Sequence, residues 1–347
     1  MMYQKIDRDN MFDAIWKFPN NLSDAIELGN NINLINDYNN ISNIVIAGMG
    51  GSAIGGDVVS ILEKSNINCP FIVSRGYELP NWVNEKTLVI CSSYSGNTEE
   101  TLAALEDGLK KKAQIIGITT GGELKVKLKA LDKDVVLIPP GLQPRAALAF
   151  SFVPMIKILE KISIIRTNVN IWLEDAISIL RYSREIYGAE SMENPTFELA
   201  QQVYKNIPII YADNSTYGIA AMRLKGQLCE NGKMLSYYND LPELNHNEIV
   251  GWENNTDHFE HLFVIWLTDQ SDNHRVKHRQ EITQEILNEI GIDQFVLEMT
   301  GNSFQERFLH MINYGDWLSF WCAISHCTDP SPVLKIDRLK QELMQRQ

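Results

Sequence analysis

The chain has 347 residues, which is enough for two domains of ordinary size. Hydrophobic residues make up 44% of it, so it can build a buried core. Its 44 acidic and 31 basic residues give a formal net charge of −13, which disfavours nonspecific binding to nucleic acid or to an anionic membrane. A small anionic ligand is still compatible, because backbone amides bind phosphate even in an acidic protein.

We expect a cytoplasmic protein. The N-terminal residues lack the apolar region of a signal peptide, and no uncharged apolar run approaches the roughly 18 residues of a membrane span. The five cysteines are scattered and lack the paired spacing of metal ligands, which is typical of reduced thiols. Cys91 and Cys229 lie beside candidate site residues, and each is expected to pack as a small hydrophobic residue.

The first half of the chain alternates short apolar runs with helical patterns. Helical spacing of apolar residues is found at 53–64, and 98–112 is also expected to be helical. The apolar runs, expected to be strands, cover 44–47, 71–73, 88–91, 115–118 and 135–138. Continuous apolar strands between helices indicate a parallel sheet that is covered on both faces.

The second half repeats this alternation after a helical stretch. Residues 142–165 and 172–187 are expected to be helical, and Asn194-Pro195 marks a break. Further strands are expected at 207–211, 234–236, 261–267 and 295–297. Further helices are expected at 218–229, 276–290, 304–325 and 334–343. The fold class is therefore α/β.

We predict two tandem domains, each a mainly parallel sheet flanked by helices in three layers. The expected boundaries are 1–155 for the first domain, 156–194 for a helical connection and 195–347 for the second domain with its C-terminal helix. The shared order of elements supports the tandem arrangement, since the two halves are too dissimilar in sequence to demonstrate a repeat.

A glycine-rich loop, Gly48-Met49-Gly50-Gly51-Ser52, joins the first expected strand to a helix. Glycines let the backbone turn tightly and approach a ligand closely. The helix that follows offers free N–H groups and the positive end of its dipole, and Ser52 adds a hydroxyl. The loop therefore indicates an anion site. It differs from a dinucleotide-binding loop, because a serine follows the glycines and no acidic residue comes about 20 positions later.

A second polar loop, Ser93-Tyr94-Ser95-Gly96-Asn97-Thr98, follows the strand at 88–91. Helix capping accounts for one or two of its polar residues, but not for all of them. Open α/β sheets bind ligands at the carboxyl ends of their strands. We therefore expect the two loops to converge on one phosphate group.

At these loops the sequence resembles the sugar isomerase (SIS) domain family. More specifically, it is similar to the bifunctional phosphoglucose/phosphomannose isomerases. Each motif alone is weak, but together they occur in the family's order from about residue 44 to the C-terminus. The motifs are GMGGSAIGGD, SSYSGNTEET, TTGGEL, QPRAALAF, LCENGK, LNHNEIVGWE and DPSPVLKIDRLK.

The resemblance implies two tandem SIS domains, a homodimer, and an isomerase that needs no metal or cofactor. It implies interconversion of glucose 6-phosphate with fructose 6-phosphate through a cis-enediolate, and extends this to mannose 6-phosphate. Acceptance of mannose 6-phosphate depends on the room near C2, which side-chain identities do not show. The phosphate-binding and substrate-binding residues implied by the resemblance are Gly50, Gly51, Ser52, Ser93, Ser95 and Thr98.

The resemblance also implies the catalytic residues. Arg145 would face the enediolate, and Glu230 would be the base that moves the proton. His246 would open the sugar ring, assisted by Lys340. In related isomerases this histidine comes from the partner subunit, which would make the dimer obligatory for catalysis.

Without the resemblance, the same four residues are less distinctive. Glu230 closes an expected helix, where a glutamate is usually exposed and structural. Arg145 lies in a turn before an apolar helix, where its charge needs an anion or water, and His246 lies in a polar stretch. Lys340 is one of several charges on an amphipathic helix. The other histidines lack a metal-binding spacing.

Two alternatives stay open at this point. One is a sugar-phosphate sensor without catalysis, although no DNA-binding or other output module is evident. The other is an isomerase of another sugar phosphate, such as sedoheptulose phosphate. An amidotransferase-linked isomerase is excluded, since the length leaves no room for a glutaminase domain.

Overall fold

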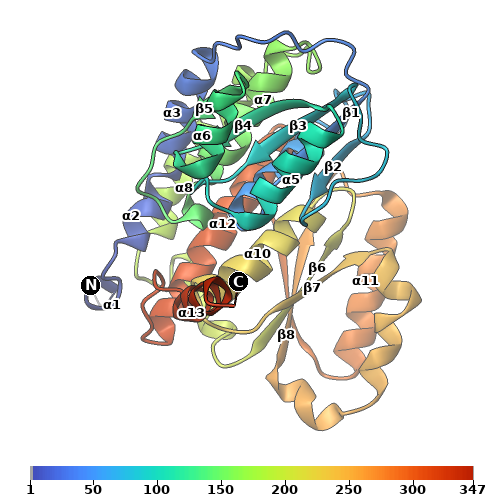
Figure 1. The fold of residues 1–347 in the computed structure, drawn as a ribbon. Helices are drawn as coiled ribbons and strands as arrows, with labels where there is room; N and C mark the ends of the chain where they lie inside the picture. Colours follow the sequence, from blue (N-terminus) through green and yellow to red (C-terminus); the bar gives the residue numbers. More distant parts are fainter. Residues whose placement is uncertain (1–2, 347) are drawn as a thin grey trace. The chain divides into compact units, whose positions relative to one another are not determined.

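Two parallel sheets organise the chain, and each belongs to a separate compact unit in the computed structural model, which describes residues 3–346 (Figure 1). We call residues 17–180 together with 302–306 the first unit. The second unit comprises the described residues up to Trp16, residues 181–301, and those from Arg307 onward.

The sheet of the first unit has the strand order β2-β1-β3-β4-β5, and all neighbouring strands are parallel. Its strands are β1 (Asn43–Ala47), β2 (Phe71–Ser74), β3 (Thr87–Ser92), β4 (Gln114–Thr119) and β5 (Asp134–Leu137). The helices are α3 (Phe18–Asn30), α4 (Gly50–Leu62), α5 (Glu99–Lys110), α6 (Gly122–Ala130), α7 (Leu148–Lys161) and α8 (Asn170–Tyr187), the last of which continues into the second unit. The winding direction changes between β1 and β3, and such a switch point is where open α/β sheets bind ligands.

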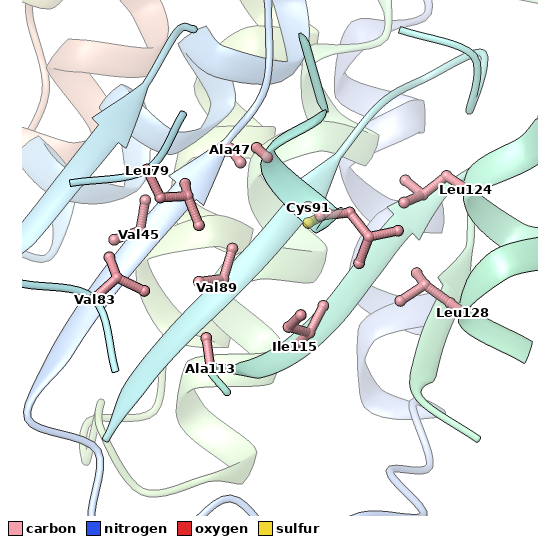
Figure 2. Packing of buried hydrophobic residues seen from close by; sticks show 12 residues of the cluster. Val45, Ala47, Leu79, Val83, Val89, Cys91, Ala113, Ile115, Leu124 and Leu128 are labelled. Carbon is pink, nitrogen blue, oxygen red and sulfur yellow. The ribbon is translucent and has the colours of Figure 1, made fainter. Parts of the chain in front are cut away.

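Apolar side chains cover both faces of this sheet, as the continuous apolar runs predicted. On one face, Val45, Val89 and Ile115 pack with residues of α5 and α6 in one buried cluster (Figure 2). Cys91 belongs to this cluster and is fully buried, which confirms that it packs as a hydrophobic residue. Burial raises the pKa of the Cys91 thiol to about 12, so it stays protonated and unreactive at neutral pH.

The sheet of the second unit has the order β7-β6-β8-β9 and is also parallel throughout. Its strands are β6 (Ile207–Asp213), β7 (Tyr237–Leu241), β8 (Leu262–Thr268) and β9 (Asp293–Glu298). Its helices are α1 (Tyr3–Ile6), α2 (Met11–Trp16), α9 (Pro195–Gln202), α10 (Gly218–Glu230), α11 (His274–Glu289), α12 (Phe304–Ser325, from Arg307) and α13 (Leu334–Met344). The order matches that of the first four strands of the other sheet, so the predicted α/β fold with two related parallel sheets is confirmed.

One expected strand was wrong. Residues 234–236 are not in a strand, because the chain is still leaving α10 there and the Met234 N–H donates to the Leu228 carbonyl. The strand begins at Tyr237 and is a partly exposed edge strand with the polar sequence Tyr-Tyr-Asn-Asp-Leu. The short apolar run Met234-Leu235 was therefore mistaken for a buried strand, although Leu235 is 65% exposed.

The N-terminal residues pack in the second unit. The rings of Phe12 and Trp16 meet Trp317 of α12 edge to face, with centroids 5.0 and 6.4 Å apart. These contacts place the N-terminal residues in the second compact unit. The domain boundaries at 155 and 194 stay a prediction. Within residues 3–346, no helix is long and apolar enough to cross a membrane.

Candidate active site

The two predicted phosphate loops meet at the switch point of the first unit. Residues 48–52 follow β1 and residues 93–98 follow β3, and these two strands are adjacent and parallel. A side-chain carbon added at Gly48 would lie 2.9 Å from the carbonyl oxygen of Ser92. The structure therefore brings the two loops together at the carboxyl edge of the sheet.

Hydroxyl groups are held in place inside the second loop. The side chains of Ser93 and Thr98 share a hydrogen bond of 2.7 Å, and the Gly96 N–H donates to the Ser93 hydroxyl at 3.0 Å. Thr98 is the N-cap residue of α5, but its side chain makes no capping bond. Capping therefore does not explain why a hydroxyl residue stands at position 98. Ser95 is exposed, and its hydroxyl accepts a hydrogen bond from the Asn97 N–H.

The loop after β4 braces the second phosphate loop. Gly96 has a φ of +72°, and a side-chain carbon there would lie only 1.9 Å from the Gly121 carbonyl oxygen. The Asn97 side-chain oxygen accepts the Glu123 N–H at 2.9 Å. The TTGGEL motif, which the sequence offered only as a family feature, thus forms a support for the phosphate loop.

Arg145 lies beside the first phosphate loop. It is buried, with 4% of its surface exposed, in a short 3₁₀-helix, η1 (Pro144–Ala146), before α7. A side-chain carbon at Gly51 would lie 2.6 Å from the Pro144 carbonyl oxygen, so only glycine lets the loop and this turn approach so closely. Ser52, also buried, follows directly. Neither loop contains Lys or Arg, and Arg145 supplies a permanent positive charge in the turn that packs against the first loop.

Glu230 is the last residue of α10 and is half-buried. The chain after it is fixed, because the buried Asn231 amide donates to the Ser319 hydroxyl at 3.0 Å. The Lys233 ammonium donates to the Glu230 carbonyl and to the Pro330 carbonyl, the latter at 2.8 Å. The backbone that carries the candidate base is therefore held from two sides.

A buried ion pair anchors the preceding turns of α10. Arg223 donates two bonds of 2.9 Å to the Asp316 carboxylate, and Gln227 adds one of 2.7 Å. Burial raises the pKa of Asp316, and the Arg223 charge opposes this shift. Such a pair costs desolvation free energy but fixes the orientation of α10 against α12.

His246 ends the 3₁₀-helix η2 (Glu243–His246), and it is exposed. Its neighbours are tied down: the Asn245 amide donates to the Thr283 hydroxyl at 2.9 Å, and Glu248 accepts bonds from Tyr211 and Asn239. The loop is thus anchored while the His246 side chain is exposed, as is typical of a histidine in a polar stretch.

Lys340 lies on α13, a helix with no buried residue, and is itself exposed. The structure therefore gathers Gly50, Gly51, Ser52, Ser93, Ser95, Thr98 and Arg145 in the first unit. Glu230, His246 and Lys340 lie in the second. No group of three or more His, Cys, Asp or Glu residues is placed to hold a metal ion among residues 3–346.

Comparisons with known proteins agree with this architecture. Residues 37–140 match the SIS domain, and residues 192–343 match the bacterial phospho-glucose isomerase C-terminal SIS domain. The fold is similar to the crystal structure of a hypothetical protein from Thermus thermophilus, with a TM-score of 0.73, 15% identity, and coverage of 99% of this chain and 92% of that one.

Two curated relatives are informative. A D-glucosamine-6-phosphate 4-epimerase from Sulfolobus acidocaldarius is 32% identical over 59% of this chain and 62% of its own. A bifunctional phosphoglucose/phosphomannose isomerase from Caldicellulosiruptor bescii is 41% identical over 96% of this chain and 98% of its own. Because this identity extends over nearly the whole length, the chain belongs to the bifunctional phosphoglucose/phosphomannose isomerase family.

Proposed function

We propose that this protein is an aldose–ketose isomerase that interconverts glucose 6-phosphate, and also mannose 6-phosphate, with fructose 6-phosphate. The observation that carries the proposal is the 41% identity, across nearly the whole chain, to the bifunctional phosphoglucose/phosphomannose isomerase from Caldicellulosiruptor bescii. The geometry of the first unit supports it, since a glycine-rich loop, a hydroxyl-rich loop and a buried arginine gather at the switch point of a parallel sheet.

In this proposal the first unit holds the phosphate. The backbone of Gly50 and Gly51 and the hydroxyls of four residues bind its oxygens. These residues are Ser52, Ser93, Ser95 and Thr98. The N-termini of α4 and α5 add free N–H groups and a favourable dipole. The loops therefore supply binding free energy and orientation, and the chemistry occurs at the other end of the sugar.

Proton transfer then runs between C1 and C2. Glu230 removes the proton next to the carbonyl, and a cis-enediolate forms. Arg145 stabilises the negative charge that develops on oxygen, because a fixed cation in a buried site needs no reorganisation. Glu230 returns the proton to the neighbouring carbon. His246, with Lys340, acts before these steps, because the ring must open to give the free carbonyl. No metal or cofactor takes part in these steps.

We further propose a homodimer in which His246 enters the partner's site. The exposed imidazole on an anchored loop supports this, because an exposed side chain is accessible to a partner subunit. A cytoplasmic location stays a prediction.

An assay of the purified protein tests the function. Glucose 6-phosphate and mannose 6-phosphate are each expected to yield fructose 6-phosphate, and a metal chelator is expected to leave the rates unchanged. Binding of these sugar phosphates without any turnover would instead indicate a sensor. Turnover that depends on metal would contradict the proposed chemistry.

The epimerase relative favours one specific second candidate, a reaction at another carbon of a hexose phosphate. Product analysis by NMR with glucose 6-phosphate and glucosamine 6-phosphate distinguishes the two. An inverted C4 would support the epimerase, whereas a ketose product supports the isomerase.

A further inference from the structure

Tyr94, inside the second phosphate loop, makes hydrogen bonds outside its own loop. Its hydroxyl donates to the Pro139 carbonyl at 3.0 Å and accepts from the Leu142 N–H at 2.9 Å. Pro139 and Leu142 are the first and fourth residues of a four-residue stretch that lies just beyond β5. In a common β-turn such residues bond to each other directly, so here the tyrosine hydroxyl stands between the two groups.

The backbone of Tyr94 is fixed as well. Its carbonyl oxygen accepts bonds from the Thr120 N–H at 3.1 Å and from the Thr120 hydroxyl at 2.8 Å. Tyr94 directly follows Ser93, whose hydroxyl bonds to Thr98. A displacement of the phosphate loop must therefore move Tyr94, and a fixed Tyr94 holds the segment at 139–142.

This segment leads directly to the candidate catalytic arginine. Only Gln143 and Pro144 separate Leu142 from Arg145, and Pro144 already belongs to η1. On its other side, the same turn touches the first phosphate loop at Gly51. The position of Arg145 is thus set by both phosphate loops, by close packing at Gly51 and by hydrogen bonds at Tyr94.

We propose that Tyr94 is a positioning residue that couples the occupied phosphate loop to the placement of Arg145. This inference rests on the proposed isomerase function, since Arg145 matters to the rate only if it stabilises the enediolate. A phenylalanine at this position keeps the ring but removes the bridging oxygen. The Pro139 carbonyl and the Leu142 N–H can then bond to each other directly, which shifts Leu142 and the turn that carries Arg145.

Tyr94→Phe tests the inference, with Tyr38→Phe as the matched control. The Tyr38 hydroxyl also makes two bonds in the first unit, to Asp134 at 2.7 Å and to the Ile115 carbonyl at 3.2 Å, but near the amino ends of β4 and β5. Tyr94→Phe is expected to lower kcat roughly tenfold, within the hundredfold that a misplaced catalytic group costs. KM is expected to change less than about twofold, because the phosphate ligands remain.

Tyr38→Phe is expected to leave both kinetic constants unchanged. Unchanged kcat in Tyr94→Phe would overturn the inference. So would a rise in KM at constant kcat, because the residue would then act in phosphate binding alone.

Hydrogen exchange tests the coupling without any turnover. With inorganic phosphate as the probe, the segment 139–147 is expected to exchange more slowly in the wild-type protein. In Tyr94→Phe this segment is expected to exchange faster and to lose its response to phosphate. Equal exchange in the two proteins would overturn the coupling. If the wild-type protein proves inactive on all hexose phosphates, the proposed function fails, whereas the exchange result still decides whether Tyr94 positions the turn.

Discussion

Single residues of the site derive their roles from neighbours that the sequence does not show. Ser93 and Thr98 were expected as phosphate ligands from the family resemblance of their polar loop, and the structure adds that each holds the other. Sequence reasoning passed over Tyr94, because its partners lie 45 and 48 positions away and no local pattern marks such bonds. The roles of Glu230 and Lys340 followed from motif order alone, since nothing local distinguishes them from helix-end and surface charges.

His310, which sequence reasoning did not single out, predicts how stability depends on pH. Its ring is buried on α12, with the Ser183 and Tyr187 hydroxyls 2.9 and 2.8 Å from Nε2. Burial lowers the pKa of His310 below its usual 6.5, so the unfolded chain binds a proton more readily than the folded one. The stabilisation is complete above about pH 6.5 and is lost progressively as the pH falls from that value toward the lower pKa of the folded state.

Thermal unfolding at pH 7.5 and 5.5 checks this expectation. The wild-type Tm is expected to fall more between these values than the Tm of His310→Gln, which has no imidazole to protonate. Each unit of pKa shift is worth about 1.4 kcal/mol, which corresponds to a few degrees for a chain of this size. An equal fall in the two proteins would show that His310 does not contribute to the pH dependence.

Helices and strands were predicted best where their apolar pattern was long. The helix expected at 304–325 matches α12 at both ends, whereas 234–236 failed because a run of three residues has no recognisable period. The N-terminal helices were missed, since the Asn-rich composition concealed the spaced core residues Phe18 and Leu22 of α3. The prediction that the loops after β1 and β3 lie together was correct, because the loops that follow parallel strands all lie at the carboxyl edge of the sheet.

The close contact between Gly51 of α4 and the turn that carries Arg145 gives a prediction about how these two elements pack. Gly51→Ala forces a methyl group to within 2.6 Å of the Pro144 carbonyl oxygen, and backbone there cannot yield cheaply. We expect kcat/KM to fall by about a hundredfold, because the phosphate loop and Arg145 move apart. Gly251→Ala is the control, since a methyl group at Gly251 meets no atom within 4 Å. Equal activity of the two variants, measured with fructose 6-phosphate, would refute the requirement for close contact.

At the scale of the whole molecule, the tandem arrangement was predictable and the packing of the chain ends was not. The repeated alternation of strands and helices indicated two α/β domains, and the matching strand orders confirm it. Nothing in the sequence showed that Phe12 and Trp16 would pack on Trp317 about 300 positions away, because such contacts depend on the complete fold. Assembly of the site across a dimer likewise follows from the resemblance and stays a proposal.

Mixing two inactive variants tests this assembly. If His246 serves the partner's site, a dimer of one Glu230→Ala chain and one His246→Ala chain contains one complete site. Random exchange of subunits makes half of the dimers mixed, so the mixture is expected to recover about one quarter of wild-type turnover. No recovery after verified subunit exchange would show that both residues serve the same chain's site.

The proton transfer itself depends on the Glu230 carboxylate, and turnover of fructose 6-phosphate by Glu230→Ala tests this most directly. Glu289→Ala is the matched control, because Glu289 also ends a helix, α11, and is exposed. We predict that Glu230→Ala loses at least about a hundredfold in kcat, as expected when a general base is removed, while Glu289→Ala keeps wild-type turnover. Turnover near the wild-type level in Glu230→Ala would contradict the account.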